Sequence, residues 1–176
     1  MKIKIIIGVL ILFIGTKILI KNEKEVINLL GSYIKYNNLE ELEKASDLIV
    51  IGEPLDEFEK RNHKATYFKD GTQEDMYTIT KLKVYEVLVT KENDVKNGEV
   101  IEIIEPITLK DNKIITTSDY DALEKEKYVI FLAKNTYGEY SIINMNEGKF
   151  KYNNKYKNSD KNSLKYQVYE KYINSN

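Results

Sequence analysis

Two stretches decide the fold: LIVIG at residues 48–52 and YVIFLA at residues 128–133. Both are short, nearly free of polar side chains, and rich in β-branched or aromatic residues. This pattern is typical of a strand that is buried on both faces or belongs to a closed barrel. Glu53 and Pro54 end the first stretch. We therefore expect two central strands, with the rest of a β-sheet built around them.

Further strand signals lie on either side of these stretches. Residues 76–90 alternate between apolar and polar, with slips around Lys81 and Tyr85-Glu86 that predict bulges or a strong bend. Within residues 55–75, an Asp70-Gly71 turn predicts a hairpin. Shorter strands are expected at residues 100–105 (ended by Pro106), 114–117, 140–145 and 149–152. The sequence thus predicts a mainly β protein with flanking helices, whose residues 45–152 form a small antiparallel Greek-key barrel of the OB type.

Helical periodicity is confined to the two ends of this barrel. Apolar residues at helical spacing predict a helix over residues 24–37, so residues 22–44 are expected to form a helical stalk. Asn38, with Glu41 three residues later, predicts a capped second helix over residues 39–45. Residues 153–176 are expected to form a polar linker and a C-terminal helix that starts after Ser163.

Residues 1–21 have the character of a membrane anchor or an uncleaved signal. A basic start precedes an apolar run, and residues 3–20 give 18 residues, close to the ~20 that cross a bilayer. No A-x-A-like cleavage triplet follows. We expect a single-pass transmembrane helix in the cell membrane with the C-terminal domain outside, although the lysines on the two sides nearly balance. The alternatives are secretion after signal cleavage, or a buried segment of a cytosolic structural domain.

Composition excludes several functions. The chain has no cysteine, which excludes disulfides, cysteine-ligated metals and a cysteine nucleophile. Four of the 27 basic residues fall in residues 1–21, which hold no acid, so residues 22–176 carry 23 basic against 28 acidic side chains, a net charge of about −5. Such a domain repels phosphate backbones, and we expect no nucleic-acid partner.

The order of several hydrophobic segments carries a resemblance. The segments are ASDLIVIGE at 45–53, KVYEVL at 83–88, VIEI at 100–103, LEKEKYVIFL at 123–132 and GKF at 148–150. In this order the chain resembles uncharacterised exported proteins of Gram-positive bacteria and, more remotely, the OB-like barrels of netrin modules and tissue inhibitors of metalloproteinases. The resemblance implies a barrel over residues 45–150. Those inhibitors chelate zinc through an N-terminal cysteine, which this chain lacks, so no functional residue is transferred.

Candidate site residues are few. His63 is the chain's one histidine, and no serine stands in a G-x-S-x-G context, so neither a histidine-rich metal site nor a familiar catalytic triad is expected. Among the acids, Asp70, Glu74 and Asp75 form the best calcium candidate, because Gly71 permits a sharp turn. Among the 14 tyrosines, a C-terminal group could form an aromatic binding face: Tyr156, Tyr166, Tyr169 and Tyr172.

These observations favour a binding function without covalent chemistry. We expect a membrane-tethered extracellular module that needs no cofactor and binds a surface protein or a glycan. The alternative is a cell-surface hydrolase that uses a pair of carboxylates, for which the mark would be two acids in one cleft with separated pKa values.

Overall fold

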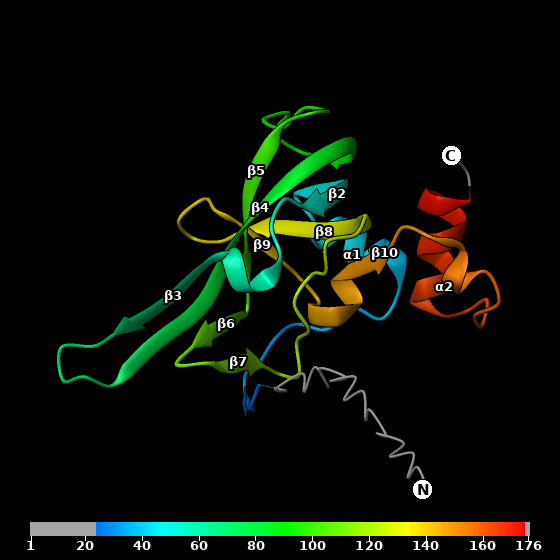
Figure 1. The fold of residues 1–176 in the computed structure, drawn as a ribbon. Coiled ribbons are helices and arrows are strands. Elements are labelled where there is room, and N and C mark those ends of the chain that lie inside the picture. Colours follow the sequence, from blue (N-terminus) through cyan, green and yellow to red (C-terminus); the bar gives the residue numbers. More distant parts are fainter. Residues whose placement is uncertain (1–23, 175–176) are drawn as a thin grey trace, which may run out of the picture.

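The computed structural model describes residues 24–174, and its central feature is a closed barrel of five strands (Figure 1). Around the barrel the order is β2, β4, β5, β9 and β8, and β8 pairs with β2 to close it. Neighbouring strands are antiparallel except for the parallel pair of β5 and β9. The predicted mainly β barrel is confirmed, and the architecture is consistent with an OB-like barrel.

The elements follow the sequence signals closely in the barrel. The barrel strands are β2 (Leu48–Pro54), β4 (Gln73–Thr90), β5 (Val100–Glu105), β8 (Tyr128–Lys134) and β9 (Tyr140–Ile142). The other strands are β1 (Val26–Leu29), β3 (Asn62–Tyr67), β6 (Ile107–Lys110), β7 (Lys113–Thr117) and β10 (Lys149–Lys151). The helices and helical turns are α1 (Leu39–Ala45), η1 (Phe58–Lys60), η2 (Met145–Gly148), η3 (Asn154–Tyr156), α2 (Leu164–Val168) and η4 (Tyr169–Ile173).

The two apolar stretches are buried on both faces, as their composition predicts. In β2, Leu48 and Val50 belong to the barrel interior, whereas Ile49 belongs to a second apolar cluster outside the barrel. In β8, Ile130 points inward and Phe131 outward in the same way. Successive strand residues face opposite sides, so a strand with apolar neighbours on both sides is apolar throughout.

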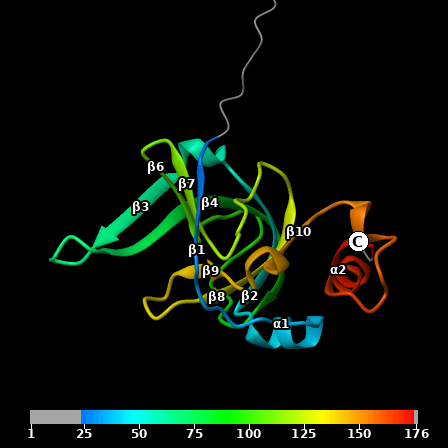
Figure 2. The same cartoon turned by 90° about the horizontal axis from the view of Figure 1, so that it is seen from below.

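Strand β4 is long and irregular. Opposite β2 its register shifts twice, and the skipped residues are Tyr85 and Leu88. The bulge predicted around Tyr85 is confirmed, whereas Lys81 sits in a regular ladder with β5. The first part of β4 pairs with β3 in a hairpin whose turn holds Gly71 at φ +84°. This hairpin projects from the barrel on the side opposite α2 (Figures 1 and 2).

The second apolar cluster is covered by helices from both ends of the barrel sequence. The side chain of Asn38 accepts a hydrogen bond from the Glu41 amide (2.9 Å), which confirms the predicted cap of α1. Ser163 caps α2 in the same way through the Tyr166 amide (3.3 Å). Helices α1, α2 and η4 bury their apolar residues against the outer face of β2, β8 and β10.

The helix predicted over residues 24–37 is wrong. Residues 26–29 form β1, which pairs in parallel with β7, and residues 30–37 contain no helix. The apolar stripe that suggested a helix has no surface to cover: Leu30 is 101% exposed and Ile34 72% exposed. Without burial an isolated helix of this length is marginal, and Gly31 weakens it further, so backbone pairing with β7 prevails.

The expected membrane anchor at residues 1–21 lies outside the described residues. Within residues 24–174, the helices are too short or too polar to cross a membrane.

Candidate functional site

A buried ion pair lies at the end of strand β5. Arg61 follows η1 and Glu105 ends β5; their side chains are buried and joined by a 2.8 Å contact from Nη1 to Oε1. Glu105 also accepts hydrogen bonds from the Thr80 hydroxyl, the Tyr120 hydroxyl (2.9 Å) and the Leu123 amide (2.8 Å). The network therefore ties strands β4 and β5 to the loop that precedes β8.

The guanidinium of Arg61 is satisfied on its other sides as well. Its Nε donates to the Asp56 carbonyl (3.0 Å) and its Nη2 to the Leu123 carbonyl (2.6 Å). Burial, with the neighbouring Glu105 charge, raises the pKa of Tyr120 well above its usual value, so this hydroxyl remains a donor. This ion pair is shielded from solvent, and its polar atoms are all bonded within the protein. It therefore positions the loop and leaves no group free to bind a substrate.

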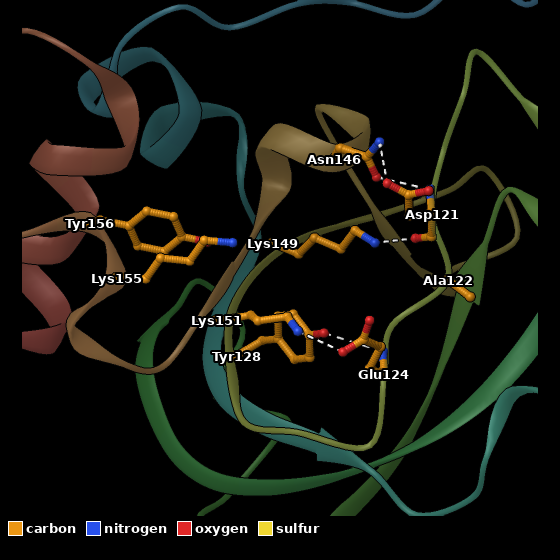
Figure 3. A pocket seen from close by; sticks show the side chains of 9 residues that line it. All are labelled: Asp121, Ala122, Glu124, Tyr128, Asn146, Lys149, Lys151, Lys155 and Tyr156. Carbon is orange, nitrogen blue, oxygen red and sulfur yellow. Dashed lines mark hydrogen bonds and ion pairs between the residues drawn. The ribbon is translucent and has the colours of Figure 1, made fainter. Parts of the chain in front are cut away.

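Beside this network lies a pocket of about 560 Å³ between the barrel end and the C-terminal segment (Figure 3). We call it the Lys149 pocket. Lysines dominate its polar lining, with two tyrosine rings among them. The lining residues are Asp121, Ala122, Glu124, Tyr128, Asn146, Lys149, Lys151, Lys155 and Tyr156.

Lys149 is the central side chain of this pocket. It starts β10, and alternation along the strand sends Lys149 and Lys151 into the pocket while Phe150 packs in the second apolar cluster. The Lys149 ammonium donates to the Asp121 carbonyl and lies 4.1 Å from the centre of the Tyr120 ring. Burial lowers the pKa of Lys149 to about 8, against the opposing charges of Glu105 and Asp121.

The other two lysines differ in their partners. Lys151 forms ion pairs with Glu124 (2.6 Å) and Glu126 (3.2 Å), and the hydrogen bond to Glu124 raises its pKa. Lys155 reaches the pocket beside Tyr156, from the C-terminal side (Figure 3). Within residues 24–174, neither Lys149 nor Lys155 pairs with a carboxylate. The pocket thus holds two ammonium groups whose charge is not balanced by a direct ion pair.

A second hollow, of about 510 Å³, lies over β4 and β5. We call it the β4–β5 groove. The β3–β4 hairpin forms one wall and the loop between β8 and β9 the other. Its lining is acidic, hydroxylated and partly aromatic: Thr66, Glu74, Asp75, Tyr77, Ile104, Asn135, Tyr137, Glu139 and Ser141. Tyr137, at the loop tip, is 87% exposed.

The predicted tyrosine face is mostly interior. Tyr169 is 2% and Tyr172 6% exposed, and both belong to the second apolar cluster. Tyr166 is half-buried beside Tyr169, with ring centres 6.4 Å apart. Tyr156 is the member that lines a pocket, and its ring also contacts Phe150 edge-on. The four residues therefore do not form one exposed face, because the helix stripe that spaced them packs on the barrel.

In the described residues, the three acids of the predicted calcium site are not brought together. Asp70 accepts a hydrogen bond from the Thr72 amide in the hairpin turn, and Asp75 accepts one from the Met76 amide. Glu74 and Asp75 line the β4–β5 groove, while Asp70 stays at the turn. Across residues 24–174, no three His, Asp or Glu side chains converge as metal ligands. The hairpin separates the turn from the groove and so separates the three acids.

Several other titratable groups have shifted pKa values. His63 lies against the edge of Phe58, and its Nδ1 contacts the Thr78 hydroxyl (2.9 Å). Burial lowers the pKa of His63. Where a carboxyl group in the described part of the chain has a shifted pKa, the shift is downward, toward the ionised form. None of these is the carboxyl with a raised pKa that a hydrolytic acid would need.

Sequence reasoning missed both Arg61 and Lys149. Arg61 is the one arginine beside 26 lysines, a signal that could have marked a buried, multiply bonded cation. Lys149 carries no such signal. Comparison with known proteins adds no further guide, since no family model, curated protein or solved structure matches the chain.

Proposed function

We propose that this protein is a membrane-tethered, extracellular binding module that holds a glycan in the β4–β5 groove and performs no covalent chemistry. The observation that carries the proposal is the position of this groove on the barrel. The argument for position rests on analogy of fold, and the argument for the ligand rests on the lining residues.

The barrel order supports an OB-type topology. Numbered along the chain, the five barrel strands follow the order 1-2-3-5-4-1, with strands 3 and 5 parallel. OB barrels bind oligonucleotides and oligosaccharides on the face of strands 2 and 3, between the loop after strand 1 and the loop after strand 4. Here strands 2 and 3 are β4 and β5, and the β4–β5 groove lies between the corresponding loops.

The lining favours a sugar over a nucleic acid. Glu74, Asp75 and Glu139 make the groove negative, which repels a phosphate backbone. Carboxylates and hydroxyls accept hydrogen bonds from sugar hydroxyls, and a negative groove favours amino sugars over acidic ones. Tyr77 and the exposed Tyr137 offer rings against which a sugar ring can pack.

The tether is supported by sequence. The apolar run at residues 3–20 has the length of a single span, and β1 begins only six residues later. The test is expression in a Gram-positive host, with protease added to intact protoplasts and sequencing of the N-terminus of the membrane-bound product. Digestion from outside with Met1 or Lys2 retained supports the tether; a protected, soluble product contradicts it.

The glycan is tested by calorimetric titration of the full-length protein in detergent micelles with a glucosamine tetramer, the neutral cellotetraose and a single-stranded oligonucleotide. We expect binding of the glucosamine tetramer, weaker binding of cellotetraose and none of the oligonucleotide. Tyr137→Ala should weaken binding about fivefold, given the ~1 kcal/mol of a sugar–ring contact. Tyr33→Ala, which removes another exposed tyrosine outside the groove, should not. If both variants bind the glucosamine tetramer with equal affinity, the groove is not the glycan site.

A further inference from the structure

Within residues 24–174, Lys149 is half-buried and forms no direct ion pair. Most interacting lysines here form direct ion pairs, as Lys151 does with Glu124 and Lys134 with Asp94. Lys149 instead rests on a carbonyl and a tyrosine ring, inside a pocket. Burying an ammonium away from a counter-ion costs stability, and such groups are concentrated at functional sites.

We propose that the Lys149 pocket binds a small organic monocarboxylate, whose carboxylate becomes the counter-ion of Lys149. This site is separate from the β4–β5 groove, and the two share no lining residue. The proposal therefore does not depend on the glycan site.

Three features of the lining define the ligand. Lys151 is held in ion pairs by Glu124 and Glu126. Among the lining groups that form no ion pair, Lys149 and Lys155 stand against Asp121, which leaves one positive charge in excess. One excess charge suits a monoanion better than a dianion. The lining contains no arginine, the residue that most often holds phosphate in a bidentate pair.

The aromatic lining and the volume of the pocket indicate what the ligand carries besides its carboxylate. Tyr128, beside Lys151, and Tyr156, beside Lys155, contribute aromatic rings to the lining (Figure 3), and a volume of about 560 Å³ lies in the range of small-molecule sites. A carboxylate alone would leave most of this volume as water. An acid with an aromatic or sugar body would fill it (Figure 3).

The protonation of Lys149 supports the assignment of this pocket as an anion site. The pKa of Lys149 is lowered to about 8, so an anion that needs the charged form should bind about tenfold more weakly at pH 9 than at pH 7. Neighbouring groups do not share this transition: the pKa values of Tyr120, Tyr128 and Lys151 are raised and that of Glu124 is lowered. The charged and titratable groups that face Lys149 are Arg61, Glu105, Tyr120, Asp121, Glu124, Tyr128, Lys151 and Lys155.

The test is an NMR titration of the lysine ¹³Cε signals of the full-length protein in micelles, with benzoate, glucuronate, neutral benzamide and phenyl phosphate as probes. We expect benzoate or glucuronate to shift the Lys149 signal and move its pKa back toward the ordinary lysine value. We expect benzamide to have no effect and phenyl phosphate to bind more weakly. Affinity should fall about tenfold between pH 7 and pH 9.

Variants separate charge from structure. Lys149→Met should abolish binding, and Lys149→Arg should keep part of it but lose the pH dependence, because arginine stays charged. Lys125→Met removes an exposed lysine outside the pocket and should change nothing. Circular dichroism establishes that each variant is folded. No response to either acid at millimolar concentration, equal binding of benzamide and benzoate, tighter binding of phenyl phosphate, or unchanged binding by Lys149→Met would overturn the proposal.

Discussion

Removing one partner of the buried Arg61–Glu105 pair should destabilise the protein more than most other single substitutions. Glu105→Leu would leave the Arg61 guanidinium without its counter-ion and the Thr80 hydroxyl, Tyr120 hydroxyl and Leu123 amide without their acceptor. Breaking a buried ion pair in this way costs about 3–5 kcal/mol. Arg61→Met should cost a similar amount, because it leaves the Glu105 carboxylate buried without a cation.

The double variant gives the sharper result. Once Glu105 is gone, the buried and unpaired guanidinium of Arg61 is itself unfavourable. Replacing both residues should therefore cost no more than one single substitution, and less than the sum of the two single losses. The assay is urea unfolding followed by tyrosine fluorescence, because the chain has no tryptophan. Glu59→Ala, which removes an exposed carboxylate paired with Lys24, serves as the matched control and should cost less than about 1 kcal/mol.

Two outcomes would refute this reasoning. A loss below about 1 kcal/mol for Glu105→Leu would mean that the network contributes little to the folded state. Strict additivity of the single losses in the double variant would mean that the two side chains act independently, in conflict with their 2.8 Å contact.

Three further stability predictions follow from single side chains. Lys149→Met should raise the free energy of unfolding at pH 7 by about 1–3 kcal/mol, because the folded protein then no longer buries a charged ammonium. The pKa of Lys149 is about 8 in the folded protein and 10.5 in the unfolded chain, so the folded protein releases the proton first and the cost of burying the charge falls as the pH rises between these values. The gain from the substitution should therefore vanish near pH 10. A less stable variant at pH 7 in urea unfolding would contradict this. Asn38→Ala should cost about 1 kcal/mol by urea unfolding, because it removes the acceptor for the Glu41 amide; an unchanged midpoint would show that the cap is unimportant. Gly148→Ala should cost more than about 2 kcal/mol, since the new Cβ would lie 1.7 Å from the Ile143 carbonyl oxygen. Gly71→Ala meets open space and should cost about 1 kcal/mol for its φ of +84° alone; equal losses at the two glycines would contradict the clash.

The barrel could be predicted because its central strands carry their signal locally. Because these strands are buried on both faces, LIVIG and YVIFLA are uninterrupted apolar runs. Bulges interrupt the alternation of apolar and polar residues where the register shifts. Helix caps are equally local, because Asn38 and Ser163 bond to amides three residues away.

What the sequence could not predict depends on distant partners. Residues 26–29 look helical until β7 offers a strand to pair with, and β6, missed altogether, is a short stretch that pairs with β7. The C-terminal tyrosines gave the right helix but the wrong exposure, since spacing alone does not say whether a stripe faces solvent or a barrel. The Lys149 pocket joins residues from three separate segments, and none of them stands out alone.

The closed barrel also limits how copies of this chain can associate through their strand edges. Sheets aggregate through open edges, and the barrel strands β2, β4, β5, β8 and β9 satisfy one another around a ring. In the described part of the chain, sheet pairing ends at β10, where lysines flank a single phenylalanine, and at β1, β3 and β6. Charged, three-residue edges are poor templates for intermolecular strand addition. At the β10 edge, this charge pattern therefore disfavours pairing with a second copy of the chain.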